Sequence, residues 1–255
     1  MEWTDEAIVL SARRHGETSA IITLITRRLG VHAGLARGGA GKRFRGLYQP
    51  GNRVCAHWRG RLAEHLGTLT CEMVTAAAAA LLDYPLKLAA LSAACAVCEQ
   101  ALPERQPHGH VFDGLAALIA ALGNGRGGGD WPSAYVKWEL GLLAELGFGL
   151  ELGSCAATGV AENLAYVSPR SGRAVSDEAA QPYRERLLVL PAFLLSRGAA
   201  GDQSEVAAGL KLTGYFLEKC VFSNYSRSLP PARLRLAERW RGEAEKKDGY
   251  HNPAA

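Results

Sequence analysis

Residues 34–51 of this chain, GLARGGAGKRFRGLYQPG, combine six glycines with four basic side chains and contain no acid. The GGAGK portion is similar to a phosphate-binding loop, which needs a glycine five residues before its Gly-Lys pair and a Ser or Thr directly after it. Ala36 and Arg43 occupy those two positions, so the hydroxyl that would bind magnesium is missing. The incomplete pattern argues against a nucleotide triphosphatase, and the charge of the segment becomes the more informative property.

Positive charge is concentrated at positions 1–75, which carry eleven Lys or Arg against six Asp or Glu, whereas positions 76–255 carry 18 against 19. No acid lies between Glu17 and Glu64. Protein surfaces normally mix both signs of charge, so a run of this length predicts a polyanionic partner. We assign phosphate contacts, which give affinity without sequence preference, to the nine basic residues in this run: Arg27, Arg28, Arg37, Lys42, Arg43, Arg45, Arg53, Arg59 and Arg61.

Enzyme signatures are absent from the sequence. It has no G-x-S-x-G elbow and no H-E-x-x-H motif, and Cys155 has no recognisable His partner. Six scattered cysteines fit a reducing compartment. Cys95 and Cys98 form a C-x-x-C pair inside an alanine-rich helical run, which favours packing over redox chemistry. We expect no catalysis and no cofactor.

The elements that would position these residues begin with β-structure. Five short runs rich in β-branched residues, or alternating in polarity, are bounded by glycine or polar turns: residues 6–12, 19–26, 31–38, 53–60 and 66–73. In the fourth run Val54, Ala56 and Trp58 fall on one face. Five such strands predict a small barrel of the OB type, which binds single-stranded nucleic acid, over residues 1–75.

Residues 34–51 then become a long loop between two strands of this barrel. Its glycines let the backbone approach a phosphate closely, and its basic residues supply charge. Phe44 and Tyr48 have two alternative roles. They stack on bases, or they close one end of the barrel.

From Thr75 onward strong helix formers replace the β pattern, which gives an α+β fold with a helical domain over residues 76–255. An inserted small module without helical periodicity is expected at residues 153–180. The aromatic stripe of Trp131, Tyr135 and Trp138 indicates a helix at the centre of a bundle. Helices are predicted within residues 75–102 (interrupted by Pro85), 110–130, 131–150, 182–197, 202–226 and 227–255. No run is long and apolar enough to predict a membrane span.

Several segments resemble the RecO family of bacterial recombination mediators. In the predicted barrel region they are DEAIVLSARRHGETSAIITLITRRLGVHAGLARGG at 5–39, YQPGN at 48–52 and HLGTLT at 65–70. YVKWELGLLAELGFGLEL at 135–152 and RSLPPARLRL at 227–236 are similar to the family's helical region. The resemblance spans nearly the whole chain, and its specificity rests on the number and order of these segments.

This resemblance implies an OB fold, a helical domain, and a non-enzymatic role in DNA repair. RecO-type proteins bind single- and double-stranded DNA and promote annealing. They engage the C-terminal tail of the single-stranded-DNA-binding protein, pair with RecR and help to load RecA. From the scattered cysteines and the lack of a predicted membrane span we expect a cytoplasmic protein, associated with the nucleoid.

An acidic tail with a hydrophobic end would need a basic rim beside an apolar pocket. Six basic residues of the helical domain are candidates for that rim: Lys137, Arg184, Arg186, Lys211, Lys219 and Arg227.

The chain departs from the family in the inserted module, which several members fold around zinc through two C-x-x-C pairs. Cys155 stands first, but Thr158 replaces the second ligand, and residues 171–176 contain no cysteine. Tetrahedral structural zinc needs four N or S ligands. We therefore expect a zinc-finger-like module that binds no zinc and is held by packing of Leu164, Tyr166 and Val175.

Two other functions remain as alternatives. An RNA-binding OB protein of RNA metabolism would prefer RNA to DNA, because RNA carries a 2′-hydroxyl group. An enzyme with an unrecognised motif would show nucleotide hydrolysis or strand cleavage.

Overall fold

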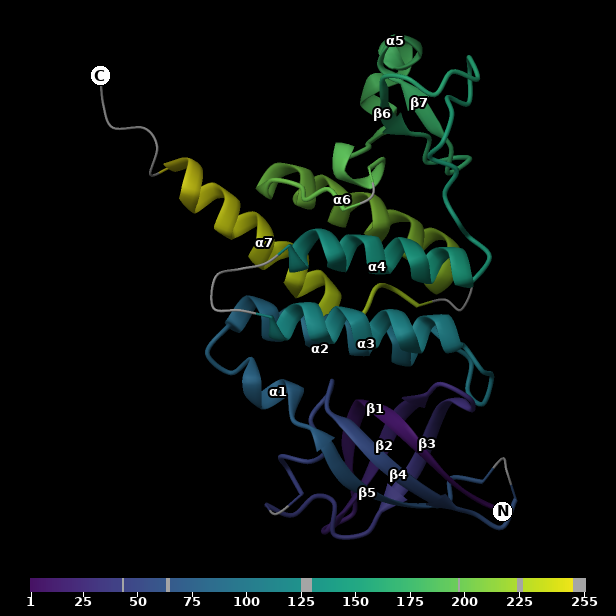
Figure 1. Ribbon diagram of the computed structural model, residues 1–255, viewed down its shortest axis with the longest axis vertical. Helices are drawn as coiled ribbons and strands as arrows, with labels where there is room; N and C mark the ends of the chain where they lie inside the picture. Colours follow the sequence, from purple (N-terminus) through teal and green to yellow (C-terminus); the bar gives the residue numbers. More distant parts are fainter. Residues whose placement is uncertain (43, 63–64, 125–129, 197, 224–226, 250–255) are drawn as a thin grey trace. The chain divides into compact units, whose positions relative to one another are not determined.

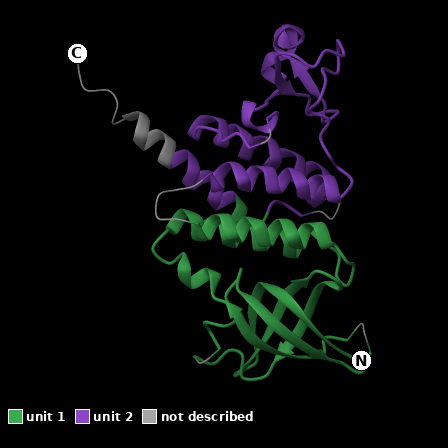
Figure 2. Cartoon of the chain, viewed as in Figure 1, with its two compact units in different colours: residues 1–126, 230–233 green, residues 127–229, 234–255 purple. Residues whose placement is uncertain are grey.

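The computed structural model describes residues 1–42, 44–62, 65–124, 130–196, 198–223 and 227–249. The chain forms two compact units, shown in different colours in Figure 2. The first contains residues 1–126 and 230–233, and the second contains residues 127–229 and 234–255.

The first unit begins with a closed barrel whose strand order is β1-β2-β3-β5-β4 (Figure 1). Neighbouring strands are antiparallel except β3 and β5, which meet in parallel at Leu35 and Thr68. The five predicted strands are confirmed, and so is the α+β class. The barrel is compatible with the OB type. Their bounds are β1 Glu2–His15, β2 Ser19–Thr26, β3 Gly30–Ala36, β4 Arg53–Arg59 and β5 Thr68–Thr75.

The alternation predicted for β4 is also confirmed. Val54, Ala56 and Trp58 point into the barrel core, whereas His57 and Arg59 are exposed. Side chains of a strand alternate between its two faces, so one face of β4 fills the barrel and the other meets solvent.

Three helices complete the first unit: α1 Ala77–Ala80, α2 Pro85–Ala101 and α3 Gly109–Gly123. Pro85 occupies the first turn of α2, where its missing N–H is not needed. α2 packs on β1 and α3 on β2. The compact unit therefore extends to residue 126, whereas the predicted OB domain ends at 75, because the apolar outer side of β1 and β2 is buried beneath these helices.

Cys95 and Cys98 are fully buried on α2, as the packing interpretation predicted. Burial raises the pKa of Cys95 to about 12, and the charge of Glu99 adds to the effect. Burial also raises the pKa of Cys98 well above its ordinary value. Both thiols are therefore kept protonated, which opposes redox chemistry.

The second unit is built on α4 Trp131–Glu145, α6 Gln203–Phe216, a π-helical continuation η3 Leu217–Phe222, and α7 Pro231–Gly249, whose first three residues belong to the first unit. The aromatic stripe of α4 is buried, as predicted. Asp202 caps α6 through a reciprocal pair of hydrogen bonds with Glu205. Among the described helices, none combines the length and apolarity needed to cross a membrane.

A small three-stranded sheet of order β7-β6-β8 lies in the second unit. Its third strand falls beyond residue 180, and an isolated bridge joins Glu151 to Arg173, so the contacts of the small module extend past both predicted boundaries. The elements are β6 Leu164–Val167, β7 Ala174–Ser176, α5 Asp177–Ala180, η1 Gln181–Arg186, β8 Leu188–Val189 and η2 Ala192–Leu194.

The helix predicted for residues 182–197 is wrong. The chain there forms two short 3₁₀ turns separated by β8, which pairs with β6. Pro182 and Pro191 flank the apolar run, and proline removes the backbone donor that an α-helix interior requires. Pairing of Leu188 and Val189 in the sheet therefore replaces helix formation.

Candidate nucleic-acid interface

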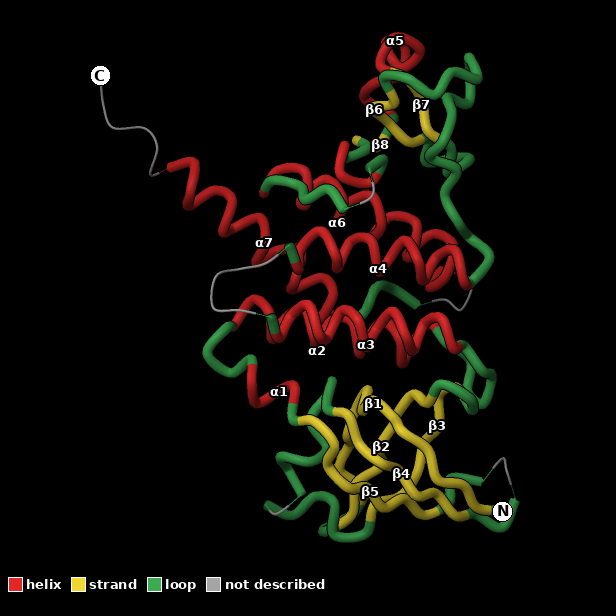
Figure 3. Tube along the Cα trace, viewed as in Figure 1, coloured by secondary structure: helices red, strands yellow, loops and turns green. Residues whose placement is uncertain are grey.

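Three strand connections meet near the end of β3. They are the β1–β2 turn at residues 16–18, the β3–β4 loop at residues 37–52 and the β4–β5 connection at residues 60–67. The N–H of Ala40 donates to the carbonyl of Thr18 at 2.9 Å, and the N–H of Leu35 donates to that of Gly67 at 3.0 Å. Figure 3 shows these connections as loops at the ends of the strands. In OB folds the first and last of these connections border the ligand-binding face.

Four exposed basic side chains lie on these connections, and none forms an ion pair within the described part of the chain. We call Arg37, Lys42, Arg45 and Arg61 the loop cations. Because no carboxylate of the described residues neutralises them, their charge is available to attract phosphate. Arg43, also predicted here, lies outside the described residues.

Four other predicted arginines are already paired with carboxylates of the first unit. Arg27 binds both carboxylate oxygens of Asp113, with Nε and Nη2 each 3.0 Å from an oxygen. The hydrogen bond and charge of Arg27 hold the pKa of Asp113 below its usual value. The other pairs are Arg28 with Asp5 at 3.2 Å, Arg53 with Glu6, and Arg59 with Glu2 at 4.0 Å.

Two of these pairs, those of Arg53 and Arg59, arise from the register of β1 against β4, whereas Arg27 and Arg28 reach Asp113 and Asp5 from the β2–β3 turn. Glu2 lies opposite Arg59, and Glu6 lies opposite Cys55. Positions 18–63 contain no acid, but the surface that they form is not free of acids. Glu2, Asp5 and Glu6 of β1 lie beside its arginines. We call Arg27, Arg28, Arg53 and Arg59 the paired arginines.

Sequence reasoning missed two basic residues of this interface, Arg13 and Arg14. Both are exposed on the last part of β1, where Arg14 lies opposite Ala20, and Ala20 in turn lies opposite Ala36, the residue before Arg37. They precede Glu17 in the sequence and so fell outside the run used to choose candidates. The available signal was their position next to the predicted β1–β2 turn.

The two aromatic side chains of the β3–β4 loop favour the barrel-closing alternative. Tyr48 is only 6% exposed and belongs to the barrel core, and Phe44 is partly buried against that core. Their rings stack on each other with centroids 6.2 Å apart. Burial raises the pKa of Tyr48 to about 12. We therefore correct the base-stacking role for Tyr48, because its ring faces the core rather than solvent.

Asn52 fixes the end of the same loop. Its side-chain amide donates to the carbonyls of Gly46 and Leu47 at 2.8 and 3.2 Å, and its oxygen accepts from the N–H of Ala78 at 3.1 Å. A buried amide with three partners holds its segment in one conformation. Three of the loop cations, Arg37, Lys42 and Arg45, are thus carried on a loop anchored at both ends.

The predicted partner-binding residues of the second unit have different surroundings. The Nζ atom of Lys137 donates to the carbonyl of Ala199 at 2.6 Å, and Arg184 contacts Tyr166 and Asp177. Lys211, Tyr215 and Lys219 are exposed at four-residue spacing along α6 and η3, so they share one face. The Nζ of Lys219 also donates to the carbonyl of Pro169. Arg186 and Arg227 are exposed.

Cys155 is buried in the small module and accepts hydrogen bonds at its Sγ atom. The N–H and hydroxyl of Ser176 lie 3.3 and 3.5 Å away, and Thr158 donates as well. Burial opposes ionisation of the thiol, but these hydrogen bonds outweigh it and lower its pKa to about 6. Within the described residues no group of three or more His, Cys, Asp or Glu is placed to hold a metal ion.

We predict a pH dependence from this thiol. A group whose pKa is lower in the folded state stabilises the fold fully above its unfolded pKa, about 8.5 for cysteine, and loses that contribution as the pH falls through the folded value. Protection of the module's amides from hydrogen exchange should therefore rise between about pH 6, the pKa of the thiol in the folded state, and about pH 8.5, its pKa in the unfolded state. The variant Cys155→Ala should lose this rise; an unchanged profile in the variant would contradict the prediction.

Comparisons with known proteins agree with this architecture. A family model described as Recombination protein O N terminal matches residues 1–77, and one described as Recombination protein O C terminal matches residues 83–230. The barrel lies within the first match and helices α2 to α6 lie within the second, so the chain has both parts of a class of recombination proteins.

Relatives with curated names identify the family. A protein named DNA repair protein RecO from Rhodospirillum centenum is 56% identical over 243 residues, which cover 94% of this chain and 95% of the relative. Proteins of the same name from Rhodospirillum rubrum and Caulobacter vibrioides are each 50% identical, over 94% and 96% of this chain and 97% and 100% of the relatives. The chain belongs to the RecO family.

Proposed function

We propose that this protein is a DNA-binding mediator of recombinational repair that acts without catalytic turnover. The observation that carries the proposal is the set of loop cations, four exposed charges without ion pairs among the described residues, on connections that converge near the end of β3. They would hold the phosphates of single- or double-stranded DNA without reading its sequence. Arg13 and Arg14 would extend this phosphate track.

The family membership supports the finer parts of the proposal. The protein would promote annealing and, together with RecR, help to load RecA onto strands coated by single-stranded-DNA-binding protein. The face formed by Lys211, Tyr215 and Lys219 offers two positive charges around an aromatic ring, which suits the acidic, hydrophobic-ended tail of that protein. The small module would have a zinc-finger-like fold but bind no zinc. The protein would act in the cytoplasm, at the nucleoid.

The test is fluorescence anisotropy of labelled oligonucleotides titrated across salt. If the interface neutralises four to six phosphates, the logarithm of affinity for single-stranded DNA should fall with the logarithm of salt at a slope of roughly −3 to −4. Binding to RNA much tighter than to DNA of the same sequence would instead support the alternative role in RNA metabolism. Absence of binding to either would overturn the proposal.

A further inference from the structure

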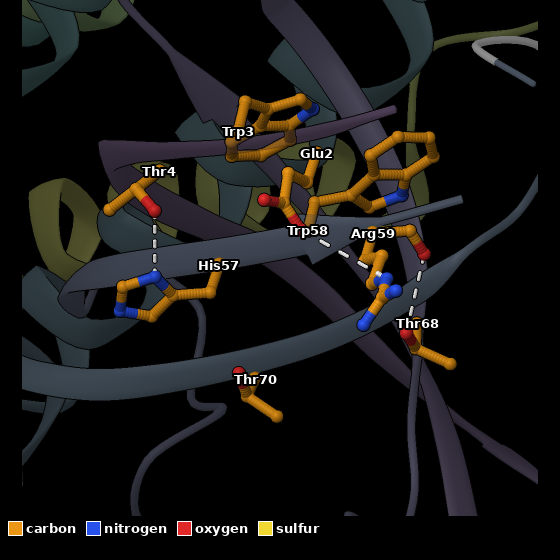
Figure 4. Close-up of a pocket in the computed structure, with 8 residues that line it drawn as sticks. All are labelled: Glu2, Trp3, Thr4, His57, Trp58, Arg59, Thr68 and Thr70. Carbon is orange, nitrogen blue, oxygen red and sulfur yellow. Dashed lines mark hydrogen bonds and ion pairs between the residues drawn. The ribbon is translucent and has the colours of Figure 1, made fainter. Parts of the chain in front are cut away.

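A hollow of about 590 Å³ lies on the outer face of the barrel, over β1, β4 and β5. Figure 4 shows its eight lining residues: Glu2, Trp3, Thr4, His57, Trp58, Arg59, Thr68 and Thr70. The strand register sets these side chains in two rows. Thr4 lies opposite His57 and His57 opposite Thr70, while Glu2 lies opposite Arg59 and Arg59 opposite Thr68.

The hollow is polar but carries no excess of formal charge, counting its histidine as neutral. The Thr4 hydroxyl and His57 Nδ1 are 2.7 Å apart, and Glu2 faces Arg59 at 4.0 Å, as the dashed lines in Figure 4 mark. A phosphate would meet the carboxylate of Glu2 here, so the loop cations are the better place for it. Hydroxyl, imidazole, carboxylate and guanidinium groups together are instead the set that proteins use to read the edges of bases.

The strands β1 and β4 themselves form the floor of the hollow, and the indoles of Trp3 and Trp58 lie against the barrel core on their opposite face. The indole rings of Trp3 and Trp58 are stacked, with centroids 6.1 Å apart and an angle of 10° between their planes. Trp58 is 3% exposed, and its Nε1 donates to the carbonyl of Leu66 at 2.9 Å. This packing fixes the strands that carry the polar side chains of the hollow.

The hollow also adjoins the proposed DNA path. On one side, Arg59 of the hollow lies two residues before Arg61, a loop cation. On the other side, Thr68 of the hollow follows Gly67, whose carbonyl accepts a hydrogen bond from β3 close to the β3–β4 loop. A strand whose phosphates lie on the loop cations would therefore pass the mouth of the hollow. A volume of about 590 Å³ falls within the range of small-ligand pockets.

We propose that this hollow holds one unstacked base of a single DNA strand whose phosphates lie on the loop cations. The inference rests on the proposed function and adds a base site to it. Bases of a duplex are paired and stacked, so this site would act on single strands alone. It would help the protein to distinguish the two forms of DNA, which phosphate contacts do not.

The first test is the double variant His57→Ala with Thr70→Val, which removes polar groups from the hollow without changing the loop cations. We expect affinity for an oligothymidine strand to fall about fivefold or more, because the loss of hydrogen bonds to a base has an effect on that scale. The salt slope and the affinity for a duplex of equal length should not change, because the phosphate contacts remain. The matched control is His110→Ala, which removes an exposed histidine of α3 and should change neither affinity.

The second test is photo-crosslinking of a strand that carries iododeoxyuridine. Crosslinked peptides should contain His57, whose ring is exposed in the hollow. If the wild-type protein binds the strand but crosslinks only elsewhere, or the double variant loses duplex affinity to the same extent, the base site is overturned and the proposed function stands. If the wild-type protein binds no DNA, both are overturned.

Discussion

The variant Trp58→Ala is expected to destabilise the barrel by about 3–5 kcal/mol, the range for removing a buried aromatic side chain. Trp58 belongs to the barrel core and is also enclosed by the β4–β5 connection. A Cβ added to Gly60 or to Gly67 would lie 2.5 Å from the Trp58 ring, so these two glycines fit directly around the indole. Removing the ring would leave a cavity and release the connection that carries Arg61.

Hydrogen exchange of the barrel strands measures this effect, because their protection reports the free energy of opening. The control is Trp58→Phe, which keeps an aromatic ring in the core but loses the hydrogen bond to Leu66. It should cost much less than the alanine variant. Protection of β4 and β5 that stays at the wild-type level in Trp58→Ala would show that this ring does not hold the barrel together.

The variant Gly30→Ala should be comparably severe, at about 4 kcal/mol or more, which is the scale of the largest single substitutions. Gly30 has a φ of +71°, and a Cβ at this position would lie 1.8 Å from the carbonyl oxygen of Gln106. The segment around Gln106 covers the edge of β3, where the N–H of Arg105 donates to the carbonyl of Val31 at 2.8 Å. The added methyl group would therefore separate a backbone contact that closes the sheet edge.

Gly16→Ala is the matched control for that variant. Gly16 has a φ of +65°, but a Cβ there would meet no atom within 4 Å. Its substitution should cost about 1 kcal/mol, the effect of the left-handed conformation alone. Equal losses of protection in the two variants would mean that the contact with Gln106 contributes nothing.

Local patterns were enough to predict the barrel. The alternation in β4 and the β-branched runs of β1 and β2 depend on neighbouring residues alone, and each strand was found. The run at 182–197 was misassigned because its apolar residues suit a helix or a strand equally, and pairing of Leu188 with Val167 in the small sheet decides between them. Val167 lies outside that run, beyond the reach of a local pattern.

The same dependence on local patterns explains why only part of the candidate interface was predicted. Counting charges along the chain found the loop cations, because they are close in sequence. It could not show that Glu6 lies beside Arg53 or that Asp113 binds Arg27, since those contacts join residues 47 and 86 positions apart. It also could not bring Arg13 and Arg14 next to the strand that leads to Arg37.

The measurement that tests the central claim most directly compares two triple variants with the wild-type protein. One replaces Arg37, Lys42 and Arg45 by alanine, and the other replaces Arg27, Arg28 and Arg53. Both remove three positive charges from the first unit, so their long-range effects on a polyanion are matched. Arg59 is left intact in both because it lines the proposed base site.

The affinity of each protein for single-stranded DNA is measured across salt. Our account predicts that the loop-cation variant binds more weakly with a slope shallower by about 2, because three phosphate contacts are lost. The paired-arginine variant should keep nearly the wild-type slope. An equal or larger loss of slope in the paired-arginine variant would contradict the account and place the DNA on the paired arginines.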